Sequence, residues 1–165
     1  MTTTTAQLGF SADDKVIFEF ELDFAGSLRC IPMIVRFKLD HACIKLSLRQ
    51  WSRFPREERE MLVRLPCQTE AQIKAYHDYL IELIALRTNE PAVELPPLAE
   101  PEWADVRRVP ERLHAYARTM SLPPPSLVRW AAMTPLQRFA LYKLSRPGHD
   151  NDNFQPAMQE FGLLG

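Results

Sequence analysis

Two stretches of this sequence carry cationic and polar side chains that could bind an anion or an acidic partner. In the first, "LRCIPMIVRFKLD", basic residues surround an apolar run; in the second, "KLSRPGHDNDNF", they lead into a polar turn. Guanidinium and ammonium groups make charge-assisted hydrogen bonds to oxyanions, and surface loops often carry such contacts. The candidate contact residues are Arg29, Arg36, Lys38, Arg146, His149 and Asn151.

Each stretch also has a structural interpretation. Residues 13–23 hold five acidic side chains and one lysine, and such a segment could neutralise the basic face within the molecule. Arg29 and Arg36 are seven positions apart, so they share a helix face if one helix begins near Leu28. Arg146 follows a predicted helix end, where the helix dipole favours a cation. The residues alone leave the structural and the binding interpretation open.

The sequence lacks the motifs that identify common catalytic and cofactor sites. Its five glycines have no phosphate-loop or dinucleotide-loop spacing, and it contains no nucleophile elbow, HExxH or CxxC. A calcium loop starting at Asp150 fails, because Phe154, Gln155 and Phe161 stand where an oxygen ligand, a glycine and a bidentate glutamate belong. The cysteines and histidines match no standard metal spacing. We therefore expect no catalytic residue, no metal and no cofactor.

Composition and charge are those of an ordinary globular protein. Hydrophobic residues make up 46% of the chain, charged residues 25%, and the formal net charge is −1. Basic and acidic side chains balance in both halves, so we expect no nucleic-acid partner. The most apolar stretch, "YLIELIAL", contains Glu82 and is far shorter than a membrane span, and "MTTTTAQLGF" does not resemble a signal peptide. Three cysteines without a disulfide pattern suit a reducing compartment, so we expect a cytoplasmic protein with no membrane partner.

The elements that must position these residues are mostly helices. Apolar spacing predicts helices over about residues 28–39, 46–51, 55–65, 69–86, 110–120, 134–145 and 154–161. Thr69 with Gln72, and Thr134 with Gln137, are capping boxes that specify two helix starts. The alternating segment "VIFEFELDF", residues 16–24, predicts a short extended arm.

The segments "WSRFPREEREMLVRL" and "WAAMTPLQRFALYKL" indicate an internal repeat. They start at Trp51 and Trp130, 79 positions apart, and the same offset relates Arg59 to Arg138. Residues that recur in this way are better explained by architecture than by one active site. We therefore expect the tryptophans to anchor the core through their indole N–H, and the arginines to pair with charges or cap carbonyls.

These patterns predict a mainly α fold: a compact helical domain of two pseudo-repeats with a short extended N-terminal arm. The predicted parts are a flexible tail at 1–14 and a single helical domain at 15–165, with pseudo-repeats at 26–87 and 111–165 and a proline-rich strap at 88–110.

The chain resembles the nitrate reductase-associated protein family. The matching motifs are "SLRCIPMIVRFKLD", "KLSLRQWSRFPREER" and "TPLQRFALYKLSRPGHDNDNF", and the resemblance extends from about residue 18 to residue 162. The family takes its name largely from genes that lie near those for nitrate reductase and molybdenum-cofactor synthesis. The resemblance implies a cytoplasmic accessory role in nitrate assimilation, and it supplies no catalytic residues.

We therefore expect a non-catalytic accessory protein that aids the assembly or regulation of a molybdenum-dependent nitrate reductase. Its partners would be the reductase or its cofactor-assembly proteins. The alternative is a small anion- or pterin-binding protein or enzyme, with Arg29, Arg36 and His149 as its contacts.

Overall fold

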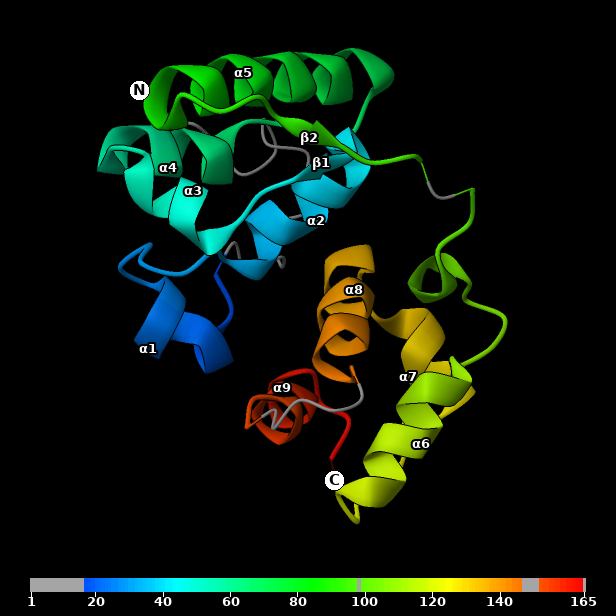
Figure 1. Ribbon diagram of the computed structural model, residues 1–165. Coiled ribbons are helices and arrows are strands. Elements are labelled where there is room, and N and C mark those ends of the chain that lie inside the picture. The colour runs from blue at the N-terminus through cyan, green and yellow to red at the C-terminus, as the bar shows by residue number, and fades with distance from the viewer. Residues whose placement is uncertain (1–16, 98, 147–151, 165) are drawn as a thin grey trace, which may run out of the picture. The chain divides into compact units, whose positions relative to one another are not determined.

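The computed structural model describes residues 17–97, 99–146 and 152–164, and these are mostly helical (Figure 1). The mainly α prediction is confirmed: the one sheet in the described residues has two strands of two residues each. The chain divides into two compact units, Met1–Pro97 and Leu98–Gly165. The division lies inside the proline-rich segment, and each unit has its own helices and its own buried side chains.

The first unit is built around its longest helix. Its elements are η2 (Glu19–Glu21, a 3₁₀ turn), α1 (Leu22–Ala25), α2 (Met33–Ala42), β1 (Ile44–Lys45), α3 (Leu48–Arg53), α4 (Arg56–Arg64), α5 (Glu70–Thr88) and β2 (Val93–Glu94). Helices α2 and α3 both pack against α5, and α4 packs against α2. The largest fully buried side chains of this core include Trp51, Phe54, Tyr76 and Leu80.

The second unit has a smaller set of helices. They are η3 (Glu102–Ala104, a 3₁₀ turn), α6 (Glu111–Thr119), α7 (Leu127–Ala132), α8 (Pro135–Leu144) and α9 (Phe154–Glu160). Helix α8 contacts both η3 and α9, and its buried face carries Phe139 and Leu141. Trp130 and Phe154 are also fully buried in this unit.

Both predicted capping boxes are confirmed. The Thr69 hydroxyl accepts a hydrogen bond from the Gln72 N–H at 3.1 Å, and the Gln72 side chain accepts from the Thr69 N–H at 3.1 Å. Thr134 and Gln137 make the same pair of bonds at the start of α8, at 3.1 and 3.0 Å. Each box satisfies two backbone N–H groups that a helix start leaves without a partner, so it fixes where the helix begins.

The predicted extended arm is wrong: residues 19–25 form η2 and α1. The alternation places Phe18 and Leu22 on one side, but Phe18 is buried whereas Leu22 is 50% exposed. The reason is Glu21, which is 1% exposed and whose carboxylate accepts from the Phe18 N–H at 3.3 Å and the Met33 N–H at 3.1 Å. These bonds close a turn at Phe18 and place a carboxylate at the start of α2, where the helix dipole favours it.

The small sheet was not predicted. Ile44 and Lys45 pair antiparallel with Glu94 and Val93, and the Leu95 N–H donates to the Cys43 carbonyl at 2.7 Å. Two residues are too few to give an alternating pattern, and the pairing joins segments far apart in the sequence. The sheet attaches the start of the proline-rich segment to the first unit.

Candidate functional site

The loop that carries Arg29 is held in place through its carbonyl groups. Leu28 has a φ of 63°, a left-handed conformation that costs a leucine free energy. Its carbonyl accepts hydrogen bonds from the Trp51 indole at 2.8 Å and from the Arg59 guanidinium at 3.0 Å. These two bonds stabilise the left-handed residue, and they fix the backbone next to the exposed Arg29.

Arg29 and Arg36 do not lie on one helix. Helix α2 begins at Met33, after Pro32 in extended conformation, so the prediction of a helix from Leu28 is wrong and the seven-residue spacing does not define a shared face. The apolar residues of this stretch are buried as predicted, but the Glu21 carboxylate sets the helix start five residues later. Arg36 is connected to the loop that carries Arg29 by a hydrogen bond to the Ile31 carbonyl.

Arg36 lies in the first turn of α2 and has an exposed side chain. Its Nε donates to the Ile31 carbonyl at 3.2 Å. Neighbouring atoms desolvate the guanidinium and lower its pKa, and the Glu21 carboxylate opposes this effect. Because part of the group stays in water, Arg36 keeps its charge. The electrostatic contact with Glu21 supports the interpretation that acidic residues of the N-terminal segment offset part of the basic face.

Lys38 is not the surface contact that the sequence predicts. Its side chain is 1% exposed, and its Nζ donates to the Val63 and Leu65 carbonyls, each at 2.6 Å. These carbonyls end α4, where a cation also interacts well with the helix dipole. Burial lowers the pKa of Lys38 to about 8. Lys38 therefore completes the end of α4 and is unavailable to a partner.

The second predicted stretch is described only in part. Arg146 follows α8 and is exposed, whereas His149 and Asn151 lie outside the described residues. Arg146 belongs to the second unit, and Arg29 and Arg36 belong to the first. The binding roles of the candidate residues therefore stay predictions.

The repeated tryptophans anchor the two cores as predicted. Trp51 and Trp130 are both fully buried. The Trp51 indole donates to the Leu28 carbonyl at 2.8 Å, and the Trp130 indole donates to the Asp105 carbonyl at 2.9 Å. Each acceptor lies in the loop before the first long helix of its unit, so each tryptophan connects a core to that loop.

The repeated arginines cap backbone carbonyls as predicted. Arg59 donates to the Phe54 carbonyl at 2.9 Å, and Arg138 donates to the Met133 carbonyl. Phe54 and Met133 are the residues that end α3 and α7, and both have extended backbone. The bounds of α3 and α7 are also 79 residues apart at both ends. These shared bonds support the two-repeat organisation. The bounds of the two pseudo-repeats over the whole chain stay a prediction.

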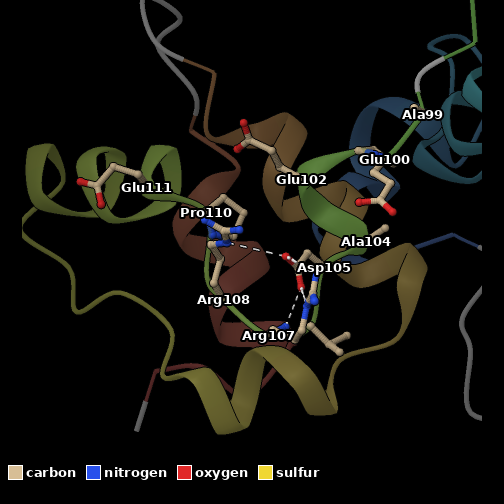
Figure 2. Close-up of a pocket in the computed structure, with 11 residues that line it drawn as sticks. Ala99, Glu100, Glu102, Ala104, Asp105, Arg107, Arg108, Pro110 and Glu111 are labelled. Carbon is tan, nitrogen blue, oxygen red and sulfur yellow. Dashed lines mark hydrogen bonds and ion pairs between the residues drawn. The ribbon is translucent and has the colours of Figure 1, made fainter.

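A hollow in the second unit is lined by residues between Ala99 and Glu111. Its volume is about 740 Å³, and its walls are mainly the turn η3 and the loop to α6 (Figure 2). Arg107 donates to the Asp105 carboxylate at 3.0 Å, and Arg108 lies 3.6 Å from it. Arg107 is the main reason that the pKa of Asp105 is lowered. Sequence patterns predict only a proline-rich strap here and not a hollow. The signal that could have indicated it is the many acidic and basic residues of this segment.

Three ionic groups of this hollow are paired with one another: Asp105, Arg107 and Arg108. Both arginines share Asp105, whose own backbone carbonyl is held by Trp130. Glu111, at the other side of the hollow, pairs with Arg118 of the same helix at 3.0 Å. The arrangement stiffens the loop before α6, and its charges of both signs select no one class of ligand.

Comparison with known families identifies the group to which this chain is related. The family described as conserved nitrate reductase-associated protein matches residues 17–161, which include nearly all of the described chain. The chain belongs to this family. Searches of curated proteins and of solved structures gave no match. The family match includes Arg29, Arg36, Arg146 and both repeated Trp–Arg pairs, so it contains the architecture and the candidate contacts together.

Two negative findings apply to the described residues. No three His, Cys, Asp or Glu side chains among them are grouped so that they could hold a metal ion. In the same residues, no helix is both long enough and apolar enough to cross a membrane.

Cys67 is buried, and burial raises the pKa of its thiol to about 11. These are the properties of a cysteine that packs as a small apolar side chain.

Proposed function

We propose that this protein is a non-catalytic accessory protein of nitrate assimilation, which acts in the cytoplasm. It binds nitrate reductase, or a protein that assembles its molybdenum cofactor, and aids assembly or regulation. The observation that carries the proposal is the family match over residues 17–161, because that family is described by its association with nitrate reductase.

The roles of the buried ionic groups support a binding protein over an enzyme. A strongly shifted pKa in a cleft is a common sign of a catalytic group, but structural networks also produce such shifts. Here the shifted groups Lys38 and Arg138 both donate to carbonyl oxygens at the ends of helices, which is a sufficient structural role. Exposed arginines are the groups that remain available to a partner.

Affinity capture tests the proposal directly. The tagged full chain is incubated with lysate from nitrate-grown cells, and bound proteins are identified by mass spectrometry and compared with those from ammonium-grown cells. We expect enrichment of a nitrate reductase subunit or a molybdenum-cofactor protein, followed by direct binding of the purified candidate. If neither class is enriched and purified nitrate reductase does not bind, the proposal is wrong.

Charge reversal tests which predicted residues make the contact. Arg36→Glu with Arg146→Glu changes one exposed predicted contact in each unit. Arg64→Glu with Arg118→Glu is a matched control, because it reverses two other exposed arginines, also one in each unit. We expect the first pair to weaken capture more than the second. Circular dichroism of both variants checks that the fold is retained.

A second candidate function is the binding of a small anion, such as nitrate or a pterin phosphate. It is supported by the exposed side chains of Arg29 and Arg36. Arg29 lies in the loop before α2, and Arg36 of α2 donates to the Ile31 carbonyl of that loop. His149 is the third predicted contact and lies outside the described residues. Thermal-shift measurements separate the two functions, because a ligand at 100 times its Kd adds about 2.7 kcal/mol to the unfolding free energy. A stable shift with such an anion would favour this candidate.

A further inference from the structure

Two arginines of α4 bind the loop that carries Arg29, at one edge of the first unit. The Arg56 guanidinium donates to the Ser27 carbonyl at 3.1 Å, and Arg59 donates to the adjacent Leu28 carbonyl at 3.0 Å. Arg29 is the next residue along the same loop and is exposed. We call Arg29, Arg56 and Arg59 the arginine cluster. Sequence spacing does not indicate it, because the loop from Ser27 to Arg29 lies about thirty residues before α4.

The cluster is preorganised, and much of its hydrogen-bonding capacity is free of carboxylates. The three hydrogen bonds that Arg59 makes with described residues all go to carbonyls, those of Ser52, Phe54 and Leu28. Arg56 is 61% exposed and pairs through Nε with Glu60 at 3.1 Å. Its bonds to described residues use Nε and Nη1, so Nη2 can bind another acceptor. Carbonyl bonds hold Arg56 and Arg59 in place, and of these two only Arg56 also pairs with a carboxylate.

The second unit does not reproduce the cluster. At the 79-residue offset, Arg56 corresponds to Pro135, and Arg59 corresponds to Arg138, which is only 7% exposed. The counterpart of Arg29 is Arg108, which lies 3.6 Å from Asp105. The carbonyl-capping role recurs in both units. Arg108 is also exposed, with 80% of its side chain accessible, but it pairs with Asp105, and Arg56 has no charged counterpart. The repeated architecture therefore does not account for Arg29 and Arg56 together.

We propose that the arginine cluster binds an acidic segment of the partner protein, a use that rests on the proposed accessory function. Arginine presents a planar fork of N–H donors that matches carboxylate groups, and fixed guanidiniums lose less entropy on binding. A nucleic acid fits less well, because the whole chain has a net charge of −1 and the nearby aromatic side chains Trp51 and Phe54 are buried, so they cannot stack on bases.

Binding of a defined acidic probe tests the cluster itself. The probe is a fluorescein-labelled oligoglutamate peptide, titrated with the full chain and followed by fluorescence anisotropy. The test variant is Arg29→Gln with Arg56→Gln, which leaves the architectural Arg59 in place. The control variant is Arg64→Gln with Lys74→Gln, which removes the same charge from exposed positions elsewhere in the first unit.

We expect the test variant to weaken peptide binding about tenfold and the control to weaken it about twofold at most. Added salt should weaken binding by the wild type and reduce the difference between wild type and test variant. Equal loss in both variants, or no binding of the peptide by the wild type, would overturn the proposal. So would tighter binding of a single-stranded oligonucleotide or of phosphatidylglycerol vesicles than of the peptide.

The same two variants separate this proposal from the proposed function. If wild type and test variant capture nitrate reductase equally, the accessory function stands and the arginine cluster is not its docking surface. If the peptide binds through the cluster but no nitrate-assimilation protein is captured, the cluster is an acidic-segment site and the proposed function is wrong.

Discussion

Lys38 allows a sharp test of how burial and hydrogen bonding compete at a charged group. Its ammonium group is 1% exposed and is bound by two carbonyls at the end of α4. Burial favours the neutral amine, whereas the carbonyl bonds favour the charged form. The perturbation is Lys38→Met, which keeps an unbranched side chain only one atom shorter and removes the titrating group.

The size of the effect follows from the shift in pKa. Burial lowers the pKa of Lys38 from 10.5 to about 8, so the folded protein releases this proton before the unfolded chain does. The unfolded state holds more protons between these two values, and the unfolding free energy therefore rises with pH across that window. At 1.36 kcal/mol per pKa unit, the rise is about 1 kcal/mol from pH 7 to pH 9, and about 3 kcal/mol when complete.

The assay is urea denaturation of wild type and variant at a series of pH values from 7 to 10. Subtracting the two unfolding free energies removes most of the titration of other groups, and we expect the wild type to gain on Lys38→Met as pH rises. Lys45→Met, at an exposed residue of β1, is the control for the removal of a surface lysine. A flat or falling difference would show that the carbonyl bonds outweigh burial and would refute the reasoning. If Lys38→Met does not fold, NMR titration of the Lys38 Cε signal gives the pKa directly.

Three further predictions concern groups with defined partners. Arg138→Met should reduce the unfolding free energy by about 2 to 4 kcal/mol, and Arg59→Met by about 1 kcal/mol, because only Arg138 is buried; urea denaturation measures both. Thr134→Ala should reduce the unfolding free energy by about 1 kcal/mol, because the Thr134 hydroxyl caps α8. Thr134→Ser keeps the hydroxyl and should stay near the wild-type value. The His77 pKa is raised by hydrogen bonding to Asp78, so its contribution to stability should be full below pH 6.5 and lost as pH rises through the raised pKa. In thermal denaturation, the stability difference between wild type and His77→Gln should therefore shrink from pH 6 to pH 8.

The parts of the fold that sequence patterns predicted are those specified locally. Helix α5 begins at its predicted capping box. Four residues of its predicted apolar stripe, Tyr76, Leu80, Leu83 and Ile84, are buried, whereas the fifth, Ile73, is half-buried. A capping box and a helical stripe both act over one or two turns, so the sequence contains all the information needed. The same holds for the start of α8.

The parts of the fold that sequence patterns did not predict depend on hydrogen bonds between one side chain and a backbone group far away in the sequence. Glu21 turns an alternating apolar segment into a 3₁₀ turn by binding the Met33 N–H, twelve residues away. Lys38 has the composition of a surface residue, and only the fold shows that its ammonium group meets the end of α4. Among the candidate contacts in the first unit, Arg29 and Arg36 remain exposed, although Arg36 also binds one backbone carbonyl, that of Ile31.

The two units also show that a structural requirement can recur where the sequence repeat does not. In the first unit Lys38 of α2 binds the last carbonyls of α4; in the second, Arg112 of α6 binds the Tyr142 carbonyl near the end of α8 at 2.7 Å. Residues 38 and 112 are not related by the 79-residue offset, yet each places its cation over a tyrosine ring as well. Helices that end inside a core leave carbonyls without partners, and a cation from the first long helix satisfies them in both units. Cations that meet such a requirement are explained by the fold, so exposed cations that meet none, above all Arg29, are where binding to a partner should be sought first.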